Sequence, residues 1–148
     1  MENKNYNATL EVSQSASEVF KSINQVTKWW TENLEGSSEK QDDVFKLLWG
    51  GESFVTCKIV ESVPDKKVIW LVTDCYLGWI KDKHEWTNTK MSFEISTNGN
   101  ATQLNFTHIG LVPEVECYND CVKGWDQYIK GSLLKFITEG SGQPQKKQ

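Results

Sequence analysis

The chain has 148 residues, a formal net charge of −4 and seven tryptophans. This length suits one domain with one sizeable core, so we predict a single domain over residues 1–148, ordered from about 6 to 140 and followed by a disordered polar tail at 141–148. Acidic and basic side chains are interspersed and form no basic stripe, which argues against nucleic acid as a partner.

The N-terminal segment and the hydropathy of the chain bear on its location. MENKNYNATLEV contains no apolar signal segment, and no stretch approaches the roughly 20 apolar residues that cross a bilayer. We therefore predict a cytoplasmic protein with no membrane insertion.

The cysteines are too few and too scattered for a disulfide framework, and a cytosol would keep them reduced as small buried hydrophobes. They are Cys57, Cys75, Cys117 and Cys121. Cys117 and Cys121 could share a helical face, and a metal site completed by His84 or His108 is the alternative. Because no C-x-x-C or H-E-x-x-H spacing occurs, we predict no metal and no cofactor.

The first third of the chain predicts a strand followed by short helices. YNATLEV at 6–12 alternates apolar and polar residues, as a strand does. Ser15 and Ser17 offer capping hydroxyls for a helix within residues 17–30, which we expect to break near Asn24 into two short pieces. The segment 34–43 is polar and predicts a loop.

The middle of the chain predicts a run of antiparallel strands. Residues 44–63 contain two strand-like runs separated by Gly50 and Gly51, which mark a hairpin. The turn at 64–67 leads to a strand at 68–76, and the turn at 98–100 separates strands at 91–96 and 102–111. We count five or six strands in sequential antiparallel order, and expect a sheet of five to seven.

The last element is a predicted long helix from about Tyr118 to Glu139, ended by Gly140. Its apolar stripe consists of Cys121, Val122, Trp125, Ile129, Ser132, Leu133 and Phe136. Gly124 and Gly131 lie beside this stripe, and each should weaken a helix by roughly 1 kcal/mol relative to alanine. Either they allow a neighbouring backbone to approach closely, or they loosen a surface edge.

These elements together predict an α+β fold. In it, a curved antiparallel β-sheet wraps around the long C-terminal helix, with one or two short helices after the first strand.

Six segments carry a resemblance to a known family. They are KWW at 28–30, KKVIWLV at 66–72, EWTNTKMSFEI at 85–95, FTHIGLVPEVECY at 106–118, GWDQYIKGSL at 124–133 and ITEGSGQP at 137–144. Over about residues 6–144 the chain resembles the START-like (SRPBCC) helix-grip domains grouped with the activator of heat-shock protein 90 ATPase, in particular their small single-domain bacterial members. This superfamily spans lipid and hormone carriers, aromatic polyketide cyclases and a co-chaperone domain, so the resemblance implies the fold and not one activity.

The resemblance also implies a cavity between the sheet and the C-terminal helix, and strand alternation selects its wall. The candidate ligand-cavity residues are Trp30, Val55, Cys57, Trp70, Val72, Phe93, Phe106, His108, Trp125, Ile129 and Ser132. Packing in a core without a ligand is the alternative interpretation of these aromatic and aliphatic side chains.

His108 is the sharpest polar candidate, because alternation turns it inward. A neutral imidazole there could hydrogen-bond a ligand, or it could be hydrogen-bonded within the wall. Asp74 and Glu85 lie near strand ends, where they could act with His108 as acid and base or remain solvated rim charges. No G-x-S-x-G elbow or phosphate loop occurs, so we assign no catalytic residue.

Three functional hypotheses remain open. The leading one is a non-enzymatic START-like domain that binds a small apolar or aromatic ligand. The alternatives are a co-chaperone-like interaction module, with a chaperone or another protein as partner, and a cyclase- or hydrolase-like enzyme that uses His108 with a carboxylate. An inward His108 meeting Asp74 or Tyr76 in a wet cavity would favour the enzyme, a dry closed core the interaction module, and an open apolar pocket the ligand carrier.

Overall fold

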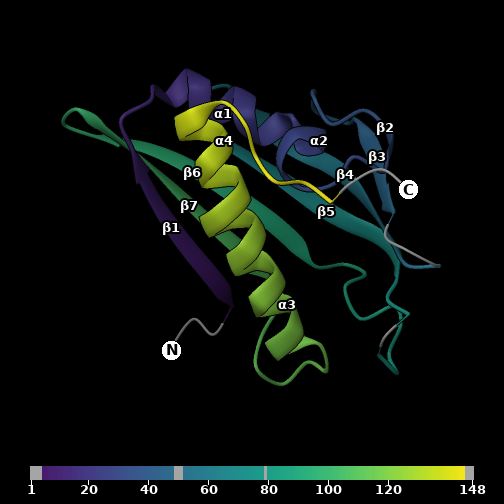
Figure 1. Cartoon of the computed structure of the whole chain (residues 1–148). Coiled ribbons are helices and arrows are strands. Elements are labelled where there is room, and N and C mark those ends of the chain that lie inside the picture. The colour runs from purple at the N-terminus through teal and green to yellow at the C-terminus, as the bar shows by residue number, and fades with distance from the viewer. Residues whose placement is uncertain (1–4, 49–51, 79, 146–148) are drawn as a thin grey trace.

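The described residues, 5–48, 52–78 and 80–145, form one sheet and several helical segments in the computed structural model (Figure 1). The strands are β1 (Tyr6–Val12), β2 (Leu34–Gly36), β3 (Val44–Leu48), β4 (Phe54–Val63), β5 (Lys67–Tyr76), β6 (Lys90–Asn98) and β7 (Ala101–Ile109). The helical segments are α1 (Ala16–Asn24), α2 (Val26–Trp29), α3 (Tyr118–Trp125), the π-helical η1 (Asp126–Leu133) and α4 (Leu134–Glu139).

The seven described strands form a single antiparallel sheet in the order β1-β7-β6-β5-β4-β3-β2. The predicted antiparallel sheet is confirmed. β1 lies beside β7, with Tyr6 opposite His108, so the sheet departs from sequential order at this edge. β2 lies in the segment that we predicted to be a loop, so this strand was missed. Its three residues pair with β3 but are too few to show a strand pattern in the sequence.

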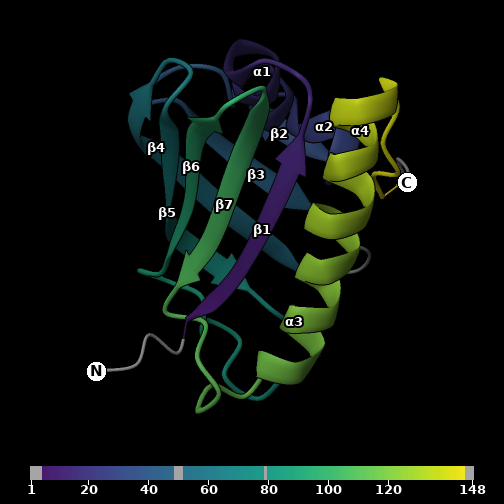
Figure 2. The same cartoon turned by 90° about the vertical axis from the view of Figure 1, so that its left-hand side faces the viewer.

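Strand alternation places the core on one face of the sheet. Burial alternates along β1 and β7, and the inward residues predicted on β4, β5, β6 and β7 are buried. Figure 2 shows α3, η1 and α4 running along one side of the sheet, with α1 and α2 at one end. The predicted α+β helix-grip architecture, a curved sheet with a long C-terminal helix, is confirmed.

Local sequence signals set the ends of several elements. Ser15 caps α1 by accepting a hydrogen bond from the Glu18 N–H, and the helix breaks after Asn24 as predicted. Gly140 adopts a left-handed conformation, with φ of 83°, and ends α4. β3 and β4 pair antiparallel, while the predicted Gly50–Gly51 turn between them lies outside the described residues.

The C-terminal helix is continuous from residue 118 to 139, but its middle is a π-helix. The buried apolar residues recur every fourth position, at Cys121, Trp125, Ile129, Leu133 and Ile137. In an α-helix a four-residue step overshoots one turn by about 40°, so such a series would drift around the helix. The wider i to i+5 turns of η1 oppose that drift and keep the series facing the sheet.

The segment after α4 is tied to the rest of the molecule. We predicted a disordered polar tail at 141–148; within its described part, Gln143 and Gln145 make hydrogen bonds to the rest of the chain. The Gln143 N–H donates to Ser132 Oγ at 2.7 Å and the Gln145 N–H to the Trp30 carbonyl at 2.9 Å. Within the described part of the chain, no helix is long and apolar enough to cross a membrane.

Candidate functional site

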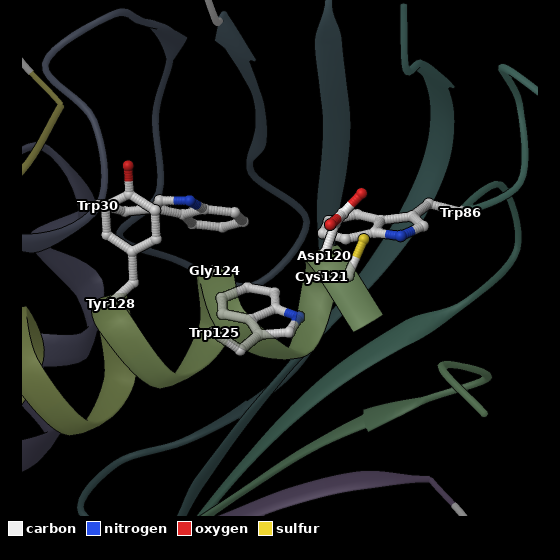
Figure 3. Close-up of a pocket in the computed structure, with 7 residues that line it drawn as sticks. All are labelled: Trp30, Trp86, Asp120, Cys121, Gly124, Trp125 and Tyr128. Atoms are coloured by element: carbon white, nitrogen blue, oxygen red, sulfur yellow. The ribbon is translucent and has the colours of Figure 1, made fainter. Parts of the chain in front are cut away.

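A small apolar cavity lies where the C-terminal helix begins, between α3, the end of α2 and the loop before β6 (Figure 3). Its volume is about 200 Å³. It is lined by Trp30, Trp86, Asp120, Cys121, Gly124, Trp125 and Tyr128. We call this cavity the tryptophan pocket. Figure 3 shows the three indole side chains around it, together with Tyr128, Asp120 and Cys121.

Trp30, which directly follows α2, is held by other aromatic rings. Its side chain stacks on Trp70 of β5 with ring centroids 6.0 Å apart and an interplanar angle of 7°. It also stacks on Trp29 at 5.8 Å. Because Trp30 is only 2% exposed and is flanked by stacked rings, it forms a preformed wall of the pocket.

Trp86 and Trp125 form the opposite part of the wall. Their rings stack at a centroid distance of 5.9 Å and an angle of 9°, and Trp125 lies 4.8 Å from Trp30. The Trp86 Nε1–H donates to Cys117 Sγ at 3.2 Å, and the Trp125 Nε1–H donates to His108 Nδ1 at 3.0 Å. Both N–H groups are therefore engaged within the protein, and these two residues offer a ligand mainly apolar ring surface.

Gly124 explains why a cavity exists at this place. Apart from its chain neighbours and the backbone of its own helix, a Cβ built on Gly124 would meet no atom within 4 Å, and the residue lines the tryptophan pocket. A Cβ on Gly131 would also meet open space, but Gly131 is exposed and does not line the pocket. The interpretation that these glycines admit a neighbouring backbone is therefore wrong at both positions. Gly124 leaves room in the pocket, and Gly131 lies on the surface.

His108 lies behind the pocket wall and is completely buried. Trp125 Nε1 can only donate, so His108 Nδ1 is the acceptor and the proton of the neutral ring is on Nε2. Nε2 lies 2.9 Å from Thr89 Oγ1, whose hydroxyl donates to the Trp86 carbonyl at 2.6 Å. Burial lowers the pKa of His108 to about 3, so the imidazole is neutral at neutral pH.

The two carboxylates considered as partners of His108 lie in other interactions. Asp74 Oδ1 accepts the N–H of the next residue at 2.9 Å. Glu85 accepts the N–H groups of Glu116 and Cys117, just before α3. Both ring nitrogens of His108 are taken by Trp125 and Thr89, so the structure does not assemble the predicted imidazole–carboxylate pair.

The eleven predicted cavity residues divide into two groups. Trp30 and Trp125 line the tryptophan pocket. The other nine are at most 1% exposed and pack in the core; they are Val55, Cys57, Trp70, Val72, Phe93, Phe106, His108, Ile129 and Ser132. Ser132 has a polar role there, because its hydroxyl donates to the Trp29 carbonyl at 2.6 Å and accepts the Gln143 N–H. Most of the space between sheet and helix is thus filled by side chains.

The cysteines differ from the prediction at one pair. Cys117 and Cys121 form a disulfide, with Cα atoms 5.6 Å apart, so the prediction that all four cysteines are reduced is wrong for these two. Four residues of separation at the start of α3 bring the Cα atoms into the range that a disulfide spans. Cys57 and Cys75 are free and buried, as predicted. Among the described residues, no group of three histidine, cysteine or acidic side chains could hold a metal ion.

Comparison with known families identifies the chain. The family model for activator of Hsp90 ATPase homolog 1-like proteins matches residues 15–137. The chain belongs to this family. None of the curated proteins matches it.

Solved structures support the fold of this activator of Hsp90 ATPase homolog 1-like chain. The solution structure of the Aha1 dimer from Colwellia psychrerythraea is 22% identical, with a TM-score of 0.73 over 93% of this chain and 98% of that one. Protein MLL2253 from Mesorhizobium loti is 14% identical, with a TM-score of 0.66 over 89% and 96% of the two chains. CalU16 from Micromonospora echinospora is 15% identical, with a TM-score of 0.62 over 90% and 76%. At these identities the similarity establishes a shared fold only.

Five residues of the pocket in this family member were not singled out from the sequence as its lining. They are Trp86, Asp120, Cys121, Gly124 and Tyr128. Trp86 lies in a loop, where no periodicity indicates a direction. Gly124 and Cys121 were noted on the helix, but a missing side chain indicates a cavity only when the surrounding atoms are known.

We expect two free thiols per unfolded chain when no reductant is present, from Cys57 and Cys75, and four after reduction. Reduction should lower the free energy of unfolding by about 2 kcal/mol, because the disulfide closes a loop of only a few residues. Thiol titration in denaturant and urea unfolding with and without reductant measure the two quantities. Four free thiols in protein purified without reductant would contradict this prediction.

Proposed function

We propose that this protein binds a small apolar or single-ring aromatic molecule in the tryptophan pocket. The observation that supports this is the pocket itself, with indole rings from three elements around a space that Gly124 leaves open. Aromatic walls that are already packed lose little freedom when a ligand binds, which favours binding. A cytoplasmic location stays a prediction.

The volume of the pocket limits the size of the ligand. An apolar cavity of about 150 Å³ accommodates benzene, whereas pockets for drug-sized ligands are usually about 300–1,000 Å³. At about 200 Å³ the tryptophan pocket suits one ring with a small substituent. A larger ligand would have to extend through the mouth of the pocket.

A protein-interaction module is the second candidate, because the same volume also suits one side chain of a partner protein. The core between sheet and helix is filled, which is the feature expected of such a module. The family is named for the activator of the Hsp90 ATPase, and one similar structure is an Aha1 dimer, so a chaperone or another protein is the partner to test.

The enzyme hypothesis has the least support. A general base has to reach the proton that it removes, and His108 is buried with both nitrogens hydrogen-bonded inside the wall. No described carboxylate is a hydrogen-bond partner of its ring.

Gly124→Leu should abolish or weaken ligand binding at least tenfold, because the new side chain occupies the open space of the pocket. Gly131→Leu is the matched control, since it removes a glycine from the same continuous helix on an exposed surface. Both variants should be as stable as the parent or up to about 1 kcal/mol more stable. Titration of a small aromatic probe, followed by tryptophan fluorescence or NMR, measures the affinity.

The outcome separates the candidates. Equal probe affinity in the Gly124→Leu and Gly131→Leu variants would contradict the assignment of this pocket. No probe binding by the parent protein, together with no small molecule retained on purification as judged by native mass spectrometry, would favour the interaction module.

A further inference from the structure

We propose that the tryptophan pocket selects an organic ammonium cation over a neutral molecule of the same shape. This inference rests on the proposed function and names the class of ligand. Aromatic rings carry negative charge density on their faces and attract a cation within about 6 Å of the ring centroid. In a space of about 200 Å³ lined by four aromatic side chains, an ammonium group would be within reach of several rings at once.

The charges around the pocket point in the same direction. Among the described residues, Asp120 is the one charged residue in the lining, and no lysine belongs to it. Asp120 is exposed at the pocket, and its carboxylate is neither hydrogen-bonded nor ion-paired to any part of the chain that the structure describes. Asp120 and Trp86 both line the pocket (Figure 3). A carboxylate next to an apolar aromatic wall favours a ligand that combines apolar surface with one positive charge.

Asp120 also has a simpler explanation, because it lies in the first turn of α3, where carboxylates interact favourably with the helix dipole. The backbone directly before α3 already has a carboxylate partner, because Glu85 accepts the backbone N–H groups of Glu116 and Cys117. The Asp120 carboxylate has no side-chain partner among the described residues, so it is available to a ligand as well as to the helix dipole.

The test compares two probes that share one shape and differ by one charge, phenyltrimethylammonium and tert-butylbenzene. We expect the parent protein to bind the cation at least tenfold more tightly. Asp120→Asn should reduce that preference severalfold, because it should weaken binding of the cation and leave the affinity for tert-butylbenzene unchanged. Glu139→Gln, which removes one exposed carboxylate at the far end of the same helix, should change neither affinity.

An organic ammonium group can belong either to a free small molecule or to a trimethylated lysine side chain. Trimethyllysine amide therefore forms a separate arm of the titration, and the tighter binder indicates the source of the cation. Binding of tert-butylbenzene as tightly as the cation overturns the selectivity while the proposed function stands. An unchanged preference in Asp120→Asn overturns the role of this carboxylate. Binding of none of the three probes overturns both proposals.

Discussion

Trp125→Ala is expected to lower the free energy of unfolding by about 3–5 kcal/mol, as other large-to-small aromatic substitutions in cores do. The Trp125 ring is 2% exposed and packs against Phe106 at 4.6 Å and Trp30 at 4.8 Å between centroids. Its removal also leaves the buried His108 Nδ1 without its donor. Urea unfolding of parent and variant measures the loss.

Trp125→Phe is the control, because it keeps an aromatic ring and removes the Nε1–H. It should cost less than Trp125→Ala, about 1–3 kcal/mol, mainly because His108 Nδ1 becomes an unsatisfied buried acceptor. A loss below about 1 kcal/mol for Trp125→Ala would show that the ring borders open space more than core. Unfolding by Trp125→Ala together with no probe binding by the parent would shift the preferred function from ligand carrier to interaction module.

Because of His108, the free energy of unfolding should decrease as the pH is lowered below about 6.5. Burial lowers its pKa from 6.5 to about 3 in the folded protein, so between these values the unfolded chain binds a proton that the folded chain does not. The stabilising contribution of the neutral ring is complete above pH 6.5 and is lost as the pH falls toward 3. The expected slope from this residue is up to about 1.4 kcal/mol per pH unit.

His108→Gln tests this prediction, because glutamine retains a donor and an acceptor for Thr89 and Trp125 but does not titrate. Urea unfolding between pH 7 and 5, where most carboxylates stay ionised, should show a flatter pH dependence in the variant than in the parent. His84→Gln removes the other of the two histidines and controls for specificity. A slope in His108→Gln equal to that of the parent would rule out His108 as its source.

Local patterns in the sequence by themselves predicted most of the strands of the sheet and the long C-terminal helix. Alternation along residues 102–109 placed Leu104, Phe106 and His108 on one face, and all three are buried. Capping at Ser15 and the left-handed Gly140 marked helix ends. These features depend on neighbours a few residues away, so periodicity and turn chemistry are sufficient to predict them.

The tertiary structure alone decided which inward side chains are core and which line a cavity. Inward position is a property of one strand or helix, but a cavity is space left between several elements. His108 illustrates this, since its ring nitrogens are taken by Trp125, 17 residues away, and Thr89, 19 residues away. Gly124 opens a pocket only because Trp30 and Trp86, distant in sequence, stand around it. The pocket depends on these long-range neighbours, which no local pattern encodes.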